Sequence, residues 1–327
     1  MQLPQLSVVI PTFRNSAVLR RVLDGYERQD APASCFEVIV VVDFSDPDPG
    51  AVDRVIAGRR VPVRRVTGAL PGASGARNAG WRVAGAPLVL FTDDDTIPAP
   101  RLVSEHLRGH RDHPDDPVAV LGHVRWARDL AVTPFMRWLE AGVQFEFDSI
   151  RDDQASWAHL YSSNVSLKRS FLERLGGFDA ERFPFGYEDL DLGYRAHQLG
   201  LRVIYNRRAT VDHWRPMTLE LWKRKASRIG TSARRFHERY PELAPTLWQR
   251  FSDAAARPAQ RGRATRVVRF VPRKVPYLGP LLWNLADLYW CQEIAPHFLA
   301  AWDQAGRGGG PVAAPGHSAL AERTLEP

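Results

Sequence analysis

Three consecutive carboxylates, Asp93, Asp94 and Asp95, are the strongest local signal for chemistry in the sequence. They follow a short apolar run, residues 88–91, where a strand is predicted to end. Adjacent carboxylates repel each other, and a divalent cation that prefers hard oxygen ligands compensates them. A metal held there can bind a diphosphate and neutralise charge on a departing nucleotide. The alternative is a solvated acidic turn, because turns favour Asp.

A second acidic group, Glu188, Asp189 and Asp191, lies at the start of a helix predicted over residues 188–199. Helical spacing places Leu190 on the buried face of this helix and fans the three acids around its first turn. The positive end of the helix dipole keeps a carboxylate ionised, which a general base requires. The alternative is ordinary capping of a helix N-terminus by acidic residues.

Two weaker features are a glycine-rich segment and a histidine. Residues 72–80 (GASGARNAG) are small, so a backbone can approach an anion at the N-terminus of the helix they open. Arg77 within it could contact phosphate or stack on a base, and the alternative is tight packing of the helix on a sheet. His213, between Asp212 and Trp214, is a candidate metal ligand, although a lone histidine is more often structural.

Alternating strands and helices in the first half of the chain would position these groups. Apolar, β-branched runs typical of buried parallel strands lie at residues 7–10 and 38–42. Further strand patterns lie at residues 61–63 and 88–91. Helical spacing lies at residues 16–26, 52–56, 75–84 and 102–107. This order predicts an α/β fold with a mostly parallel, open sheet flanked by helices. Ligands bind beyond the carboxyl ends of such strands, which selects residues 11–15, 43–46 and 93–95.

The second half of the chain has a less regular pattern. Strands are predicted at residues 119–126 and 201–205. Helices are predicted at residues 166–175 and 188–199, and a basic helix or pair of helices at 222–240. Residues 305–327 are rich in Gly, Pro and Ala, which predicts a disordered tail.

The basic residues of the chain are concentrated near its C-terminus. The 327 residues carry 44 Lys and Arg against 37 Asp and Glu, a net charge of +7. Seven basic residues and no acidic residue lie in 257–274, and Tyr, Leu and Trp follow closely. Residues 257–301 therefore suit an anionic membrane surface, and the alternative is a helix packed on the rest of the protein. The run lacks a groove-reading module, so we expect no nucleic-acid partner.

The cysteines and the apolar runs indicate in which cellular compartment the protein is expected. The two cysteines, Cys35 and Cys291, lie far apart and outside any CxxC pair, which predicts no disulfide and a reducing cytoplasm. No stretch has the roughly 18 uninterrupted apolar residues of a transmembrane helix. We expect a cytoplasmic protein, peripheral on the inner face of the cell membrane if residues 257–301 bind it.

Together, these features occur in the order found in a known family. The segments 8–15 (VVIPTFRN), 41–45 (VVDFS), 75–80 (GARNAG), 91–95 (FTDDD), 176–179 (GGFD) and 186–191 (GYEDLD) resemble the inverting family 2 glycosyltransferases. The resemblance covers about residues 6–215 and implies the GT-A fold. It divides the chain into a catalytic domain, 1–215, with a nucleotide-binding half (1–100) and an acceptor half (101–215). A helical extension, 216–301, and a disordered tail, 302–327, would follow.

The resemblance also implies roles for single residues. Contacts to the nucleotide or donor sugar are implied at Pro11, Thr12, Asp43, Arg77, Asn78, Asp93 and Asn164. Metal ligation by Mn²⁺ or Mg²⁺ is implied at Asp93, Asp95 and His213. Asp189 resembles the base of the Glu-Asp motif, with Glu188 and Asp191 in supporting roles.

The implied reaction is a single displacement with inversion at the sugar. Asp189 would take the proton of an acceptor hydroxyl while the metal stabilises the departing nucleoside diphosphate. A UDP-sugar donor and a carbohydrate, lipid-linked or small-molecule acceptor are expected. The turn after the second strand departs from the usual Asp-Asp-Gly-Ser, because Val42 and Phe44 replace the first acid and the glycine. The alternatives are a sugar-nucleotide nucleotidyltransferase and a non-catalytic sugar-nucleotide-binding protein.

Overall fold

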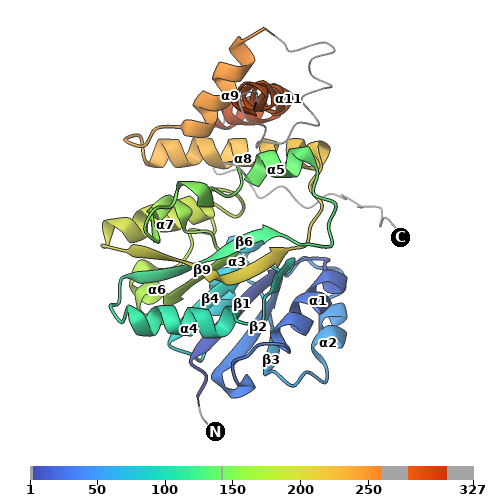
Figure 1. The fold of residues 1–327 in the computed structure, drawn as a ribbon, viewed down its shortest axis with the longest axis vertical. Coiled ribbons are helices and arrows are strands. Elements are labelled where there is room, and N and C mark those ends of the chain that lie inside the picture. The colour runs from blue at the N-terminus through green and yellow to red at the C-terminus, as the bar shows by residue number, and fades with distance from the viewer. Residues whose placement is uncertain (1–2, 141–142, 259–278, 308–327) are drawn as a thin grey trace.

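The computed structural model describes residues 3–140, 143–258 and 279–307. These residues form one nine-stranded sheet with the order β3-β2-β1-β4-β8-β6-β9-β5, and β7 pairs with β9 outside this path. The strands are β1 (Leu6–Thr12), β2 (Phe36–Val42), β3 (Val63–Thr67), β4 (Leu88–Thr92), β5 (Thr96–Pro98), β6 (Val118–Trp126), β7 (Gln154–Ala155), β8 (Asn164–Lys168) and β9 (Arg202–His213). The α/β fold predicted from the sequence is therefore confirmed (Figure 1).

Strands β3, β2, β1 and β4 form the parallel half of the sheet. Their runs of Val, Ile and Leu are fully buried in β1 and β2, as expected for strands covered on both faces. Because the strands are parallel, Thr12, Val42, Thr67 and Thr92 end at one edge of the sheet. The three turns selected from the sequence, at residues 11–15, 43–46 and 93–95, lie at this edge.

The other half of the sheet is mixed. Strand β8 runs antiparallel to both β4 and β6, whereas β9 runs parallel to β6. The helix predicted over residues 166–175 was wrong in its first three residues, which belong to β8. Ser166 and Leu167 are buried where β8 pairs with β4 and β6, which favours a strand over a surface helix. Strand β9 also extends past its predicted end at Tyr205 and brings His213 beside Thr96 and Trp126.

The predicted helices of this layer are present and pack on the sheet. They are α1 (Ser16–Tyr26), α2 (Gly50–Ile56), α3 (Gly72–Arg82), α4 (Leu102–Asp112), α6 (Arg169–Leu175) and α7 (Glu188–Gln198), with short turns η1 (Ala33–Cys35), η2 (Phe147–Ser149) and η3 (Trp157–His159). One helix face was predicted wrongly. Leu192 and Ala196 are the buried apolar residues of α7, while Leu190 is only partly buried. The helix lies against η3 and is tied to α8 through Asp191 and Arg239, while Leu192 and Ala196 pack in the core of the sheet layer, so its inner face is rotated.

A second layer of helices lies beyond the sheet (Figure 1). It contains α5 (Pro134–Glu140), α8 (Leu219–Arg239), α9 (Thr246–Ala256) and α11 (Gly279–Arg307). Helix α8 is a single helix, and it crosses between the sheet layer and the pair α9 and α11. Trp138, Trp222, Phe251 and Phe298 are each almost completely buried in the core of this layer.

The helical layer differs from the expected C-terminal extension in two ways. Helix α5 belongs to it although it lies within residues 1–215, since Trp138 donates a hydrogen bond to Asp287 of α11 over 2.8 Å. Helix α11 continues to Arg307, beyond the expected end at residue 301. Most of the basic run, residues 259–274, and the tail from residue 308 lie outside the described residues. Within the described part of the chain, no helix is both long and apolar enough to span a membrane.

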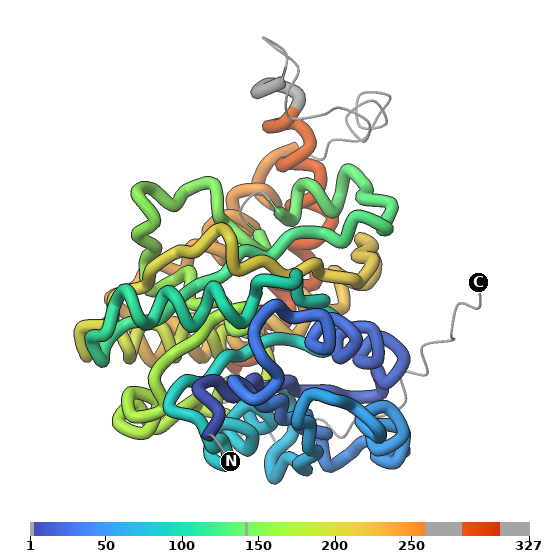
Figure 2. The backbone as a smooth tube through the Cα atoms, turned by 60° about the horizontal axis from the view of Figure 1, so that its bottom comes forward, coloured from blue at the N-terminus to red at the C-terminus, as the bar shows by residue number. Residues whose placement is uncertain are grey.

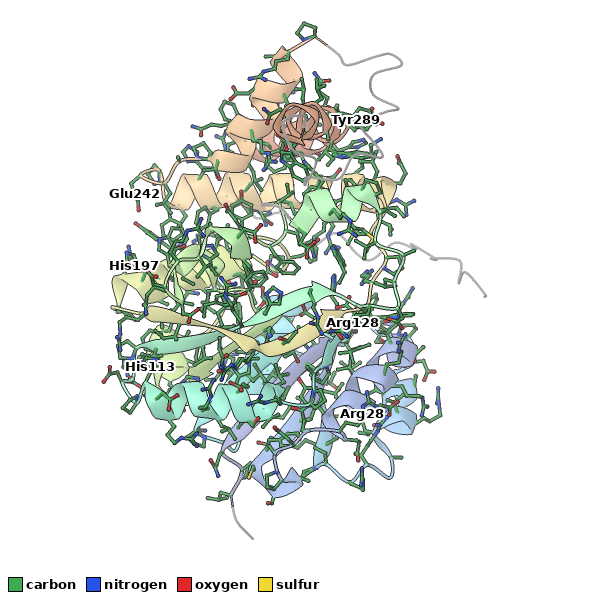
Figure 3. The ribbon with its side chains drawn as sticks, in the orientation of Figure 1. Arg28, His113, Arg128, His197, Glu242 and Tyr289 are labelled. Atoms are coloured by element: carbon green, nitrogen blue, oxygen red, sulfur yellow. The ribbon has the colours of Figure 1, made fainter. Side chains whose placement is uncertain are left out.

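The two layers place the N-terminal strands far from the last helix. In Figure 1 the N-terminus and α11 lie at opposite ends of the molecule, and in Figure 2 the orange-red α11 begins at the end away from the N-terminus and runs behind the other elements. Figure 3 shows the same separation by single residues, with Tyr289 in the helical layer and Arg28 and His113 in the sheet layer. The carboxyl edge of the parallel strands and the underside of α8 lie between these ends.

Candidate active site

The three acids after β4 point to three different partners. Asp94 accepts hydrogen bonds from Thr12 Oγ1 at 2.6 Å and Asn15 Nδ2 at 2.9 Å. Burial raises the pKa of Asp94 to about 7, and the neighbouring Asp95 adds to the shift. The middle acid therefore ties the acidic turn to the end of β1. Thr12, predicted to contact the nucleotide, uses its hydroxyl here.

Asp95 faces the end of β9. Its Oδ1 lies 3.4 Å from His213 Nε2, and its Oδ2 lies 3.6 Å from Arg215 Nη1. Burial alone would raise the pKa of Asp95, but His213 and Arg215 outweigh it and hold the pKa below its usual value. The β5–β9 pairing sets this contact, because it aligns Thr96 with His213. The structure thus brings together two of the three predicted metal ligands.

Arg77 joins the third acid to the start of α7. Its Nη2 donates to Asp93 Oδ1 over 2.7 Å, and its Nη1 lies 3.5 Å from Glu188 Oε1. The Arg77 side chain is only 5% exposed. Two acidic groups that are 95 positions apart in sequence therefore meet across one guanidinium. The predicted contact of Arg77 with the donor stays a prediction, since much of its hydrogen-bonding capacity is used by these acids.

Asp189 lies next to this bridge. Its Oδ2 accepts a hydrogen bond of 3.0 Å from the backbone N–H of Ser162, which precedes β8. Its Oδ1 is buried, and the described residues offer it no hydrogen-bond partner. Burial raises the pKa of Asp189 to about 7, the charge of Glu188 adds to this, and Arg77 opposes it. A carboxyl with this pKa can exchange a proton near neutral pH.

A loop clamped from two sides holds Glu188 and Asp189 in place. On the α3 side, Ser74 Oγ donates to Phe183 O over 2.5 Å. On the α8 side, Ser232 Oγ donates to Phe185 O over 2.8 Å. Tyr187, the residue before Glu188, has a φ of 65°, which is strained for a bulky residue. Strain of this kind persists only where the surrounding contacts fix the chain, and here it sets the direction in which α7 begins.

Asn78 belongs to the same clamp. Its Nδ2 donates to Phe178 O over 2.7 Å, and its Oδ1 accepts from Phe178 N over 3.0 Å. A Cβ on Gly80 would come within 2.4 Å of Val9, so this glycine lets α3 pack closely on β1. The structure thus supports the packing interpretation of residues 72–80. The predicted donor contact of Asn78 stays untested, with both its polar atoms engaged inside the protein.

Asp191, predicted as a supporting acid, lies away from this bridge. It is completely buried and accepts hydrogen bonds from Arg195 Nε and Tyr240 Oη, both over 2.9 Å. Arg239 of α8 lies 3.6 Å from the same carboxylate. The structure therefore gives Asp191 a role in joining α7 to α8.

Asn164 and Asp43, predicted as donor contacts, are both engaged within the protein. Asn164 Oδ1 pairs with His106 Nε2 at 2.9 Å, and its Nδ2 donates to Ala209 O over 2.9 Å. Asp43 accepts from Ser45 Oγ over 2.6 Å and from Gly72 N over 2.9 Å. Asn164 is fully buried, so it supports the sheet from within. Asp43 and the last residues of β1, Pro11 and Thr12, remain at the predicted ligand-binding edge.

Sequence reasoning missed two cations of the site. Arg215 follows β9 and contacts Asp95, as described above. Lys225 lies on α8, where burial lowers its pKa, while the charges of Glu188 and Asp93 oppose that shift. The position of Arg215, two residues after His213, was the one available signal. Nothing in the sequence pattern of α8 distinguishes Lys225 from its basic neighbours.

Several buried polar atoms of the site lack partners among the described residues. They are Arg77 Nε, Ser163 Oγ, Glu188 Oε2, Asp189 Oδ1 and His213 Nδ1. Native proteins rarely leave such atoms unpaired, so their concentration indicates a place for a polar ligand. Among the described residues, no group of three or more His, Cys, Asp or Glu side chains is arranged to hold a metal ion.

Comparisons with known proteins agree with this fold. Two solved structures share the fold at low identity. The mannosyltransferase PcManGT of Pyrobaculum calidifontis, in complex with GDP-Man and Mn²⁺, is 21% identical with a TM-score of 0.54, covering 94% of this chain and 76% of that one. S. aureus TarS 1–349 in complex with UDP is 15% identical with a TM-score of 0.51, covering 93% and 91%. The fold is the predicted GT-A fold.

Curated relatives are found at higher identity. Validoxylamine A glucosyltransferase of Streptomyces hygroscopicus subsp. jinggangensis is 28% identical over 278 residues, 75% of this chain and 63% of that protein. The probable glycosyltransferase YdaM of Bacillus subtilis is 25% identical over 240 residues, 69% and 54%. The chain thus spans less than two thirds of the length of these relatives. The family model described as "Glycosyltransferase like family 2" matches residues 4–231. The chain belongs to glycosyltransferase family 2.

Proposed function

We propose that this protein transfers a sugar from a nucleoside diphosphate donor, a UDP-sugar, to an acceptor hydroxyl with inversion at the sugar. The observation that carries the proposal is the Arg77 bridge. It joins Asp93, at the carboxyl end of β4, to Glu188 at 2.7 and 3.5 Å, with Asp189 beside it. Acids from two distant segments thus border one region that contains unpartnered polar atoms.

Asp189 is the proposed general base. As the acceptor oxygen attacks the anomeric carbon, its proton passes to Asp189 and the bond from the sugar to the diphosphate breaks. A base works best when its pKa lies near the operating pH, and Asp189 has a pKa of about 7. The hydrogen bond from Ser162 N at 3.0 Å fixes one carboxylate oxygen and leaves the other for the proton. A single attack of this kind inverts the anomeric centre.

The donor diphosphate is proposed to lie between the acidic turn and α8. Arg215 and Lys225 supply positive charge on this side, and Asp93 and Asp95 contribute to the field around Lys225. Cations that are already in place stabilise the charge developing on a leaving diphosphate.

A divalent metal, Mn²⁺ or Mg²⁺, is part of the proposal. The residues present fit it in part: Asp95 Oδ1 and His213 Nε2 lie 3.4 Å apart and form a two-ligand set, with Asp93 held nearby by Arg77. Such ions often bind through one or two carboxylates together with substrate phosphates, so two or three protein ligands suffice. When bound, the metal would neutralise charge on the diphosphate. The Mn²⁺ in the PcManGT structure supports this choice.

The acceptor is proposed to be a carbohydrate, a lipid-linked sugar or a small molecule. The name of the Streptomyces relative states a small-molecule acceptor, validoxylamine A, for that protein. The lipid-linked alternative depends on residues 257–301 as a contact with an anionic membrane surface. Within this range, the described part of α11 packs on α8 and α9, as in the alternative of a helix packed on the protein. The membrane contact stays a proposal, since residues 259–278 lie outside the described part of the chain.

The products released from nucleotide sugars test the proposed function. The full chain is incubated with UDP-, GDP-, ADP- and dTDP-sugars, Mn²⁺ and candidate acceptors, and free nucleotide and pyrophosphate are measured. Release of a nucleoside diphosphate, with a glycosylated product of inverted configuration by NMR, is expected. In a parallel incubation with nucleoside triphosphates and sugar 1-phosphates, release of pyrophosphate would instead indicate a nucleotidyltransferase. Tight donor binding without turnover would indicate a non-catalytic binding protein, and either result overturns the proposal.

A further inference from the structure

Phe44 is an exposed aromatic residue at the carboxyl end of β2. Phe44 is 55% exposed. Large apolar side chains with this exposure are few in the described chain, namely Leu3, Phe44, Leu70, Val83 and Leu199. Leu70, at 41%, lies on the loop between β3 and α3, so Phe44 and Leu70 follow two adjacent parallel strands.

Hydrogen bonds tie the loops that carry these two residues to each other. Asp43, the neighbour of Phe44, accepts from Gly72 N over 2.9 Å, and Gly68 N donates to Val42 O over 2.8 Å. On the other side, Arg14 N donates to Asp46 over 2.7 Å. The turns after β1, β2 and β3 are therefore fixed to one another. Phe44 projects from the turn after β2 and is not part of the hydrophobic core.

The position of Phe44 identifies what can cover it. Ligands of open α/β sheets bind beyond the carboxyl ends of the strands, which is where Phe44 and Leu70 lie. An exposed aromatic ring at such a place offers a face to a flat π system. The donor's nucleobase is the part of the proposed substrate with that chemistry, since its diphosphate requires the charged groups near Asp93 and Asp95.

We propose that Phe44 stacks on the nucleobase of the donor, with Leu70 closing the apolar side of the same site. This inference rests on the proposed function, because it needs a nucleotide donor. Asp43 then acts in part by holding the two loops together through Gly72, while Ser45 fixes the Asp43 side chain within its own turn. Since every base has a π face, stacking contributes affinity without choosing one base over another.

Nucleoside diphosphates and pyrophosphate separate the base from the phosphates. UDP, GDP, ADP, CDP and inorganic pyrophosphate are titrated calorimetrically, with Mn²⁺, into the wild type and Phe44→Ala. The substitution should weaken each nucleotide that the wild type binds by about 10- to 100-fold and leave pyrophosphate unchanged. Leu70→Ala should weaken the nucleotides less. Val83→Ala is the matched control, as Val83 is 43% exposed at the far end of α3.

A tryptophan at the same place gives a direct signature of stacking. Phe44→Trp should keep the nucleotide affinity, and the added fluorescence should be quenched by a bound nucleoside diphosphate but not by pyrophosphate. Equal nucleotide affinity in Phe44→Ala and wild type would overturn the inference and leave the proposed function intact. So would an equal loss for pyrophosphate. A wild type that binds no nucleoside diphosphate would instead overturn both.

Discussion

At the scale of single residues, Asp189 is the group on which turnover should depend most. Asp189→Asn removes the proton acceptor and keeps the shape and the hydrogen bond from Ser162 N. Turnover should fall by about 10²- to 10⁴-fold, with donor affinity unchanged by calorimetry. Asp253→Asn, at an exposed acid of α9, is the control for expression and folding. Near-normal turnover of Asp189→Asn would exclude this residue as the base.

The pH dependence of turnover follows from the same side chain. The base must be ionised, and the pKa of Asp189 is raised to about 7, so turnover should rise with pH below about 7 and level off above it. Glu188 contributes to the raised pKa through its negative charge, whereas Arg77 lowers it. Glu188→Gln should therefore shift the rise to lower pH in a pH–rate profile. A shift to higher pH, or a profile without a rise, would contradict the assignment.

The metal proposal is tested by binding rather than by activity alone. Chelation with EDTA should abolish transfer, and Mn²⁺ should restore it. His213→Ala should weaken Mn²⁺ binding, followed by electron paramagnetic resonance with a nucleoside diphosphate present, by about tenfold or more. His197→Ala is the matched control, because His197 is an exposed residue near the end of α7 (Figure 3). Equal Mn²⁺ affinity of the two variants would remove His213 from the ligand set.

At the scale of elements, the loop before α7 depends on helices from both sides. Ser232→Ala deletes the hydrogen bond to Phe185 O on the α8 side, an interaction with a net contribution of about 0.5–1.5 kcal/mol. We expect a severalfold lower turnover, an unchanged donor affinity and a small fall in Tm. Ser227→Ala is the control on the same helix, since Ser227 bonds only its own helix backbone, at Lys223 O. Equal turnover of the two variants would show that the loop does not need α8.

The strands and helices also show how much of the fold can be predicted from sequence patterns. Continuous Val and Ile runs predicted β1 and β2, because burial on both faces leaves one strand pattern possible. Strand β8 was missed because its five residues lead directly into α6, and a short run beside a helix has no period of its own. Asp93, Asp95 and His213 were found from local motifs. Lys225 and the internal roles of Asn78 and Asn164 depend on contacts between distant segments, which no local pattern contains.

At the scale of the whole molecule, α8 joins the sheet layer to the helical layer. Its inner side contacts the loop before α7, and its outer side packs on α11. Gly230 lies where the two helices cross, and a Cβ there would come within 2.3 Å of Phe298 O. A backbone atom of a packed helix cannot move aside alone, so close packing of the two layers requires glycine at this position.

Gly230→Ala should therefore separate the layers slightly and destabilise the protein. Overpacking of this kind costs about 1–3 kcal/mol, although Ala is the better helix former. Gly306→Ala is the matched control, because the atoms nearest its Cβ would belong to the movable guanidinium of Arg234. We expect a lower Tm and faster proteolysis for Gly230→Ala and no loss for Gly306→Ala. If α8 transmits the strain to the loop before α7, Gly230→Ala also lowers turnover at temperatures where it is fully folded. Unchanged turnover there would show that the active site in the sheet layer works independently of α11.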